Sequence, residues 1–483
     1  MPPVPPSHFT DPFLETLQSA SHINAQDDPN YYANDPKSLI SQSNVHTFVN
    51  GTGSSVYNSL VPLLESTNHE LILVTCFWAR SDTLQTLNNA LLKLSDKAIR
   101  RGTEKIRVQL CFSSSSLFQK LFHKQSTSGQ EYPPSDWVNK LGLPPKSELG
   151  GLDLTVKSIF ILPFSVMHPK YIILDRQTVV LPSCNISWEE WFEGAVVLSG
   201  PIVSQFTTFH TEFWQRQSPP ALPAASPSEA PISHPEPGTS NLPHAHTITH
   251  FPSASLSGVP TIFLPSPHRR NPHFQPFTPS SNVKPPSTPL NIFLLTILAK
   301  ATSNVTIQTP NLTSPPVLSA LLSALSRGID VHIRTSARLM ILEQLVTAGT
   351  TTSRCIKTLI KRYKNFLRQH PPPSSTSTDE EAAIAISPYR PGRLRIEFFE
   401  PLGGPRKKGQ EGGEPQQSHL KMMCVDGEVV VLGSGNLDRA SWFTSQELGV
   451  AFFDKEFVGN VLGSVEEGMR GRTRVVFDSA ENV

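Results

Sequence analysis

The pattern His-x-Lys-x4-Asp occurs twice in this chain, and a Ser-x-Asn triplet follows each copy at the same distance. The first copy consists of His168, Lys170, Asp175, Ser183 and Asn185, and the second consists of His419, Lys421, Asp426, Ser434 and Asn436. One copy alone has little specificity. A second copy with the same downstream partner predicts one composite active site built from both.

These residue types favour chemistry at phosphorus. If residues 167–174 and 420–425 are strands, each histidine and its lysine lie on the same face of a sheet. Lysine and asparagine side chains can then neutralise and hydrogen-bond the non-bridging oxygens of a phosphate as charge develops. One imidazole can attack phosphorus while the other protonates the leaving oxygen, which explains why two histidines are needed.

The two copies resemble the signature of the phospholipase D superfamily, His-x-Lys-x4-Asp-x6-Gly-Ser-x-Asn. The second copy matches it at every position, including Gly433, whereas the first has Pro182 in place of that glycine. Proline lacks a backbone N–H and fixes φ near −65°, so we expect a differently shaped turn before Ser183. The family also has an acidic residue after the asparagine that orients a catalytic histidine, and Glu193 and Glu447 stand at such positions.

The resemblance implies a phosphodiesterase or phosphatidyltransferase that works through a phosphohistidine intermediate. By that resemblance His168 is the expected nucleophile and His419 the acid that protonates the leaving group, although the reverse assignment stays open. Lys170, Lys421, Asn185 and Asn436 are expected to hold the phosphoryl oxygens. Asp175 and Asp426, each at a strand end before a turn, are expected to be structural members of the site. The scheme needs no metal or other cofactor.

The elements around the motifs also occur twice. In the first half we predict a strand at 71–78, a helix after Ser81 that ends at Gly102, and a strand of alternating apolar residues from Ile106. The second half has the same order: a strand at 304–308, a helix at 318–325 that ends at Gly328, and a strand of alternating apolar residues from Ile329. We therefore predict an α/β fold of two similar α/β/α lobes related by pseudo-twofold symmetry, with the active site between them. Because both half-sites are in one chain, we expect a monomer.

The predicted lobes span residues 46–217 and 290–483, after an N-terminal extension at 1–45. Residues 218–289 are rich in proline, serine and histidine and predict a disordered linker or insertion. Residues 371–380 and 401–418 are expected to be flexible loops, the second of them at the rim of the site because it leads directly into His419.

The substrate is less closely specified than the reaction. A net charge of +1 argues against a field that captures polyanions, and apolar residues flank the first motif, so a phospholipid is favoured. A nuclease would instead use the basic, apolar-striped segment at 356–369 and the clusters Arg269-Arg270 and Arg406-Lys407-Lys408. A third alternative is a decayed scaffold that binds phosphate groups or membranes without turnover.

Composition and targeting signals set the remaining bounds. The chain has 483 residues, 38% of them hydrophobic, which suits a globular protein. The start, Met-Pro-Pro-Val-Pro-Pro, lacks the features of a signal peptide, and apolar runs stop near ten residues. We therefore expect a cytoplasmic protein or one peripheral to an intracellular membrane. Five scattered cysteines form no C-x-x-C pair, and Cys184 and Cys424 within the motifs are expected to be packing residues.

Overall fold

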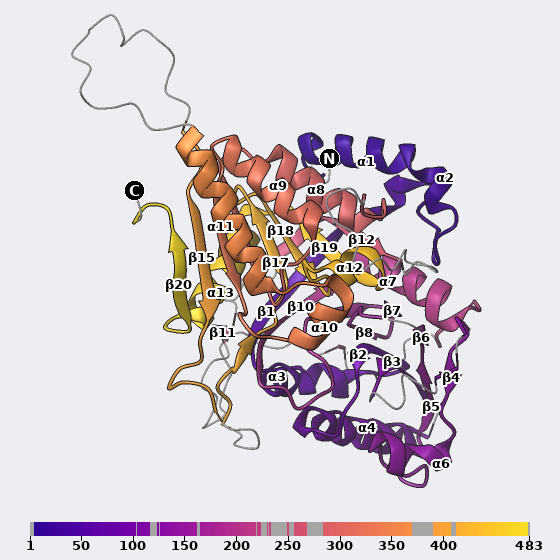
Figure 1. Cartoon of the computed structure of the whole chain (residues 1–483). Helices are drawn as coiled ribbons and strands as arrows, with labels where there is room; N and C mark the ends of the chain where they lie inside the picture. Colours follow the sequence, from indigo (N-terminus) through magenta and orange to yellow (C-terminus); the bar gives the residue numbers. More distant parts are fainter. Residues whose placement is uncertain are drawn as a thin grey trace, which may run out of the picture.

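The computed structural model of the chain describes residues 4–102, 104–115, 123–124, 126–161, 165–218, 220–223, 229, 231–232, 249–250, 256–267, 284–369, 390–406 and 412–481. Two lobes of mixed β-sheet and helices lie side by side, with helices on the outer faces of the strands (Figure 1). This arrangement confirms the predicted α/β class.

The two lobes contain the same succession of elements. The first has β1 (Ile40–Gly51), α3 (Gly53–Ser66), β2 (Glu70–Phe77), α4 (Asp82–Arg101), β3 (Ile106–Ser114), β5 (Leu152–Ser158), β8 (Tyr171–Leu174), β9 (Thr178–Pro182), β10 (Trp191–Ser199) and α7 (Ile202–His210). The second has β12 (Leu256–Ser266), α8 (Pro289–Lys300), β13 (Asn304–Thr309), α9 (Pro315–Ser326), β14 (Asp330–Thr335), β15 (Leu394–Phe399), β17 (Met422–Val425), β18 (Val429–Gly433), β19 (Glu447–Phe452) and α13 (Lys455–Met469).

Strand pairing follows the same order in both lobes. In the first lobe β2, β3 and β5 are parallel, and β8, β9, β10 and β1 continue from β2 in antiparallel fashion. In the second lobe β13, β14 and β15 are parallel, and β17, β18, β19 and β12 continue from β13. β1 pairs with β12, with Ile40 opposite Ile262, so strand pairing runs from one lobe into the other.

The sequence explains the main elements directly. Ser81 caps α4 by accepting a hydrogen bond from the Leu84 N–H, and Gly102 ends the helix in the left-handed conformation, as expected. α4 packs Leu87, Leu91 and Leu94 into the core of the first lobe.

Residues 256–266 correct the prediction of a disordered linker. They form β12, which lies between β1 and β19 and is buried from Val259 to Ser266. β12 precedes α8 as β1 precedes α3, so the second lobe begins within the segment that we expected to be a linker. Pro260 and Pro265 hid this strand, because proline inside a run argues against a central strand.

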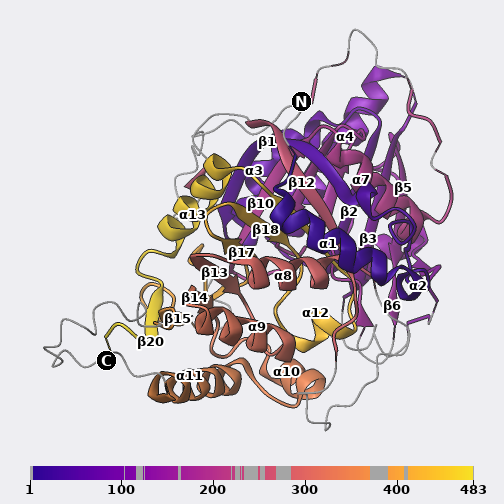
Figure 2. The same cartoon turned by 90° about the horizontal axis from the view of Figure 1, so that it is seen from above.

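The N-terminal extension is also part of the fold. β1 begins at Ile40, before the expected boundary at residue 45. Helix α1 (Ser7–Ser19) lies against α8 of the second lobe (Figures 1 and 2) and packs Phe13 edge to face on Phe293. The first residues of the described chain therefore help to build the core of the second lobe.

Of the two expected flexible loops, residues 371–380 lie outside the described residues. In the other loop, described at 401–406 and 412–418, the prediction of flexibility is wrong for the second part. Glu414 is buried and accepts two hydrogen bonds from Arg472, each 2.7 Å long, and β16 (Gln417–Ser418) pairs with β10. The N–H groups of Gly412 and Gly413 in this loop donate to Glu190, the residue before Trp191.

Candidate active site

Both motifs begin just before a strand and end just after the next one. His168 and Lys170 precede β8, and His419 and Lys421 precede β17, so the expected continuous strands over residues 167–174 and 420–425 start later than predicted. The histidines are free to leave the sheet because the chain there pairs with the opposite lobe. His168 N–H donates to the Gln446 carbonyl, and His419 N–H donates to the Phe192 carbonyl.

That exchange of backbone bonds places each histidine beside the acidic residue of the other lobe. Gln446 and Phe192 immediately precede Glu447 and Glu193. The distance from His168 Nδ1 to Glu447 Oε2 is 2.8 Å, and the distance from His419 Nδ1 to Glu193 Oε1 is 2.6 Å. A carboxylate at Nδ1 favours the tautomer that carries its proton there and leaves Nε2 available for chemistry.

The motif serines hold these carboxylates in place. Ser434 Oγ donates to Glu447 Oε2 over 2.5 Å, and Ser183 Oγ donates to Glu193. Each serine Oγ also accepts from the backbone N–H of the residue after the glutamate, at 2.9 Å for Ser183 and 3.0 Å for Ser434. The role of the serines is therefore to position the acids that face the histidines.

Pro182 does not disturb this arrangement. It ends β9 opposite Ala195, and the Ser183 N–H still donates to the Gly194 carbonyl over 2.8 Å. The second copy has the same 2.8 Å bond between Ser434 N–H and the Leu448 carbonyl. There glycine is required, because a Cβ on Gly433 would stand 2.3 Å from the Leu448 oxygen. The expected difference in the serine turn is absent from the hydrogen bonds of the two copies.

The motif aspartates are structural. Asp175 accepts hydrogen bonds from the backbone N–H groups of Asn68, His69 and Glu70 at the start of β2. Asp426 accepts in the same way from the N–H groups at positions 302, 303 and 304, before β13. Both aspartates have positive φ, 48° and 56°, and fix the turn that follows each motif strand.

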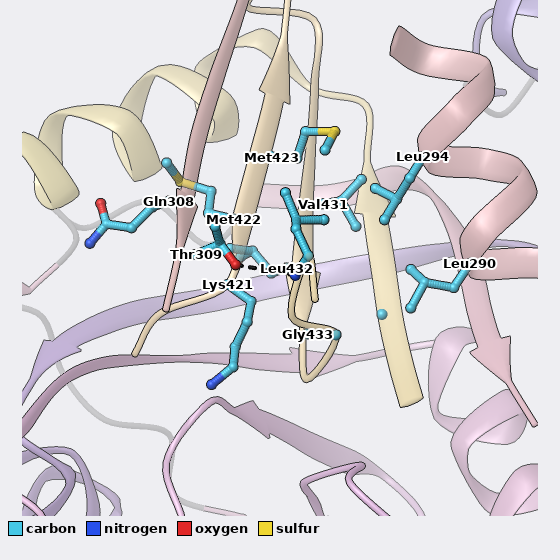
Figure 3. A pocket seen from close by; sticks show the side chains of 13 residues that line it. Leu290, Leu294, Gln308, Thr309, Lys421, Met422, Met423, Val431, Leu432 and Gly433 are labelled. Carbon is cyan, nitrogen blue, oxygen red and sulfur yellow. Dashed lines mark hydrogen bonds between the residues drawn. The ribbon is translucent and has the colours of Figure 1, made fainter. Parts of the chain in front are cut away.

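The lysines are buried close to the histidines. Lys170 Nζ donates to the His168 carbonyl over 3.1 Å, and Lys421 Nζ donates to the His419 carbonyl over 2.6 Å. Lys421 Nζ also lies 2.8 Å from His419 Nδ1. Burial lowers the pKa of Lys421 to about 7. Figure 3 shows the Lys421 side chain extending away from Leu294, Val431 and Met423, which surround a small apolar cavity of about 30 Å³ beside the site.

Burial controls the charge of the imidazoles. It lowers the pKa of His168, against the opposing effect of Glu447, and lowers the pKa of His419 to about 3, against the effect of Glu193. Lys170 and Lys421 each lower the pKa of both imidazoles further, so the two lysines and the two histidines share one electrostatic environment. Burial alone would raise the pKa of Glu193, but His419, Lys421 and Ser183 together lower it. Burial therefore favours the neutral form of both imidazoles in the free protein.

A cavity of about 200 Å³ brings the two half-sites together. Five predicted site residues line it, namely His168, Asn185, His419, Asn436 and Glu447. Asn436 Oδ1 and Glu447 Oε1 are buried on this wall and have no hydrogen-bond partner among the described residues, as expected for atoms that face a ligand. Lys170, Lys421, Glu193 and Ser434 stand behind the lining, in contact with the groups that form it.

The cavity contains residues that the motif pattern does not reveal. Burial raises the pKa of Glu189 to about 7, and burial also raises the pKa of Asp438, so both carboxyl groups bind protons more tightly than usual. The Trp191 ring lies 4.5 Å from the His419 ring and partly covers it. Glu189 and Trp191 are close in sequence to Asn185, and Asp438 is close to Asn436; this closeness was the sequence signal that could have identified them. Met340 and Glu343 reach the cavity from a separate helix, and no sequence signal pointed to them.

Some of the other residues singled out in the sequence lie in the described part of the chain and others do not. Cys184 and Cys424 are buried in the apolar cores, in keeping with a packing role. Arg269, Arg270, Lys407 and Lys408 of the proposed basic clusters lie outside the described residues. Within the described part of the chain no group of three or more histidine, cysteine or acidic side chains is arranged to hold a metal ion. No helix there is long and apolar enough to cross a membrane.

Comparisons with known proteins agree with this architecture. Residues 294–467 match a family model described as the phospholipase D-like domain of cardiolipin synthase. The crystal structure of phosphatidylserine synthase from Haemophilus influenzae Rd KW20 superposes with a TM-score of 0.54 at 12% identity, over 94% of this chain and 92% of that one. No curated protein sequence gives a significant match.

Two smaller solved structures match less than half of this chain. Nuc from Salmonella typhimurium, a phospholipase D family member, matches 38% of this chain and 90% of its own at 16% identity, with a TM-score of 0.25. NucT from Helicobacter pylori matches 37% of this chain and 85% of its own at 17% identity, with a TM-score of 0.23.

Proposed function

We propose that the chain is a member of the phospholipase D superfamily, which the match of residues 294–467 to the family model supports, and that it is a phosphodiesterase or phosphatidyltransferase that acts on a phospholipid. One observation carries the proposal: two imidazoles, each with Nδ1 on a carboxylate from the opposite lobe, face the same cavity. Two half-sites without a catalytic role would not need each histidine to be paired with a glutamate of the opposite lobe.

In the proposed first step, His168 Nε2 attacks phosphorus and the bond from phosphorus to the leaving oxygen breaks. His419 Nε2 gives its proton to that oxygen, and a phosphohistidine remains on His168. Water or an acceptor alcohol then loses its proton to His419 and attacks phosphorus, which breaks the phosphorus–nitrogen bond and frees His168. Lys170, Lys421, Asn185 and Asn436 stabilise the charge on the phosphoryl oxygens.

The surroundings of the two rings support this assignment. The His168 side chain is 12% exposed and the His419 side chain 3%, so His168 is the more accessible nucleophile. The Trp191 ring lies 4.5 Å from the His419 ring, tilted by 46°, and its π-system would favour the protonated form of His419. His419 is neutral in the free protein, and the negative charge of a bound phosphodiester would raise its pKa toward that of a working acid.

A phospholipid suits the described cavity better than a nucleic acid does. Val166 and Trp191 from the apolar flanks of the first motif line the cavity, and Trp188 is exposed nearby in sequence, whereas Phe160 and Phe192 belong to the core. The exposed cations of α11 (Thr352–Gln369) are the observation that favours a nuclease. The fold admits both substrates, so the test must include both.

The test measures turnover of labelled phosphatidylcholine, phosphatidylglycerol and single-stranded DNA by the wild type, His168→Asn and His419→Asn, each with and without chelator. His22→Asn, on an exposed helical histidine, is the matched control. We expect lipid turnover by the wild type and control, unaffected by chelator, and only trace residual turnover by the site variants. Cleavage of DNA alone would replace lipid with nucleic acid, and inactivity of all four proteins would favour a phosphate- or membrane-binding protein.

The covalent step has its own test. A substrate labelled in its phosphoryl group, quenched early and followed by peptide mapping, should place the label on His168. Label on His419 would reverse the assignment of the two histidines. Label on neither residue under conditions of turnover would overturn the covalent mechanism.

A further inference from the structure

Helix α10 (Ile341–Ala348) is inverted, with its apolar side chains turned to solvent. Its only buried residue is Gln344. The exposed fractions are 80% for Leu342, 45% for Val346, 39% for Ile341, 38% for Leu345 and 36% for the preceding Met340. Isolated exposed apolar residues are normal, but five within seven consecutive positions form a patch that calls for a function.

Polar bonds, rather than apolar burial, hold this helix in place. Gln344 Nε2 donates to the Asn311 side-chain oxygen over 2.8 Å and to the Leu339 carbonyl over 2.6 Å. Its Oε1 accepts from the Thr352 N–H over 2.6 Å and from the Thr352 hydroxyl over 3.0 Å. The structure thus fixes the helix through one buried amide while the apolar side chains remain outside.

The next helix supplies positive charge beside this patch. α11 buries Ile356, Leu359 and Tyr363 against the lobe. Its exposed cations recur at helical spacing along the outer side, at Arg354, Lys357, Lys361, Lys364 and Arg368. α10 and α11 lie next to each other at the front of Figure 1 and along the lower edge of Figure 2, so both views place them in one outer layer of the second lobe.

The patch is continuous with the catalytic cavity. Met340 and Glu343 at the start of α10 line the same cavity as His168 and His419. We propose that α10 and the outer side of α11 dock on an anionic phospholipid bilayer, with the apolar side chains of α10 among the acyl chains and the α11 cations among the headgroups. The inference rests on the proposed function and specifies how that site reaches its substrate.

The charge pattern selects this occupant over the alternatives. Apolar side chains next to a basic stripe match an anionic lipid surface, which offers a hydrocarbon layer beneath negative headgroups. A nucleic-acid backbone would leave the α10 side chains in water. A second copy of the chain would have to bury the cations of α11 against an equally basic surface if the contact were symmetric.

Flotation of the full chain with vesicles tests the docking independently of turnover. The probe vesicles are phosphatidylcholine with about 30% phosphatidylglycerol, and the comparison vesicles are pure phosphatidylcholine. We expect most of the wild-type protein to float with the probe vesicles and a much smaller fraction to float with pure phosphatidylcholine. Leu342→Ser with Val346→Ser, and separately Lys357→Glu with Lys361→Glu, should each weaken binding about tenfold or more. The matched controls are Ile99→Ser, on an exposed residue of α4, and Lys105→Glu with Lys146→Glu, which change exposed lysines of the first lobe.

Turnover of a short-chain phospholipid below its micelle concentration separates docking from catalysis. The α10 and α11 variants should keep this activity and lose activity on vesicles. Equal flotation of variants and controls would overturn the docking proposal and leave the proposed chemistry intact. A concentration-dependent dimer that the α10 variant abolishes would assign the patch to a second copy. Flotation without any turnover would retain the docking surface and refute the proposed function.

Discussion

Each motif histidine is completed by a residue that its own lobe cannot provide. His168 Nδ1 is hydrogen-bonded to the carboxylate of Glu447, and His419 Nδ1 is hydrogen-bonded to the carboxylate of Glu193. The serine of each motif holds the glutamate of its own lobe, so Ser434 acts on His168 and Ser183 acts on His419. At the residue scale the two half-sites therefore depend on each other, and a substitution in one should impair the histidine of the other.

Glu193→Gln tests this dependence. The amide keeps the size of the side chain but removes the charge that faces His419 Nδ1, and it can present an N–H where an acceptor is needed. We expect kcat to fall about a hundredfold or more while the fold is retained. The measurement is steady-state turnover of a soluble short-chain phospholipid, with circular dichroism to verify folding.

The control for this substitution is Glu131→Gln, on an exposed residue of β4 (Gln130–Glu131). The double variant Glu193→Gln with His419→Asn should be no slower than His419→Asn alone, because the carboxylate acts through the ring. Multiplied losses in the double variant would mean that Glu193 acts separately from His419.

The pKa values predict a bell-shaped pH profile with its maximum on the mildly acidic side. The nucleophile must be neutral, and because burial lowers the pKa of His168 the acid limb of kcat/KM should lie below about 6.5. The Lys421 ammonium must be charged to bind phosphate. With a pKa of about 7 it loses its proton as the pH rises, so kcat/KM should fall above about pH 7.

Lys421→Arg identifies the group behind the alkaline limb. A guanidinium remains charged throughout this range, so the limb should move to higher pH even if the maximum rate is lower. An unchanged alkaline limb in this variant would assign the titration to another group.

At the scale of elements, β12 joins the strands of the two lobes. It pairs with β1 on one side and β19 on the other, and it buries Ile262, Phe263 and Leu264 completely. Phe263 packs against Phe206 and Phe209 of α7, at ring distances of 4.9 and 6.1 Å. A strand of the second repeat thus packs on a helix of the first.

Phe263→Ala measures what this strand contributes. Removal of a fully buried ring should lower the free energy of unfolding by about 3 to 5 kcal/mol, because the transfer energy is lost and a cavity remains. Chemical denaturation of the full chain checks this value. Ser257→Ala, at an exposed position of the same strand, should change it by less than about 0.5 kcal/mol. Equal small effects at both positions would contradict the central place of β12.

The sequence predicted the elements whose local signals agree with their tertiary surroundings. The strand and helix around Ser81 and Gly102 have a cap, an apolar stripe and a left-handed terminator, and all three are present. β12 was missed because its prolines contradict a central position and only pairing with distant β1 and β19 stabilises it. Pro260 still contributes its carbonyl, which accepts from the Phe453 N–H over 3.0 Å.

The site was predicted as residues but not as a geometry. The motif pattern identified the histidines, the lysines and the acids, because their spacing is fixed by short loops between neighbouring strands. It could not show that each acid serves the opposite lobe, since that depends on the backbone bonds of Gln446 and Phe192 across the interface. Met340 and Glu343 were likewise hidden, because their helix is distant in sequence and its pattern is inverted.

At the scale of the whole molecule, the lobes form one structural unit in three independent ways. Strand pairing passes from β1 to β12, helix α1 packs on α8 of the second lobe, and the two motif segments exchange backbone hydrogen bonds. Residues of both lobes contribute to one apolar core cluster, which includes Val196 and Phe206 of the first lobe and Val430 and Phe452 of the second. A molecule joined in this way should open its two lobes together rather than one at a time.

Native-state hydrogen exchange of two core variants can test this coupling. Leu91→Ala, in α4 of the first lobe, should lower the free energy of unfolding by about 2 to 5 kcal/mol. If the lobes open as one unit, the slowest amides of β13 in the second lobe should lose the same protection as those of β2. Leu321→Ala, in α9 of the second lobe, is the reciprocal variant and should weaken β2 equally. Loss of protection confined to the mutated lobe would show that the lobes open independently, and the shared site would then depend on their reassociation.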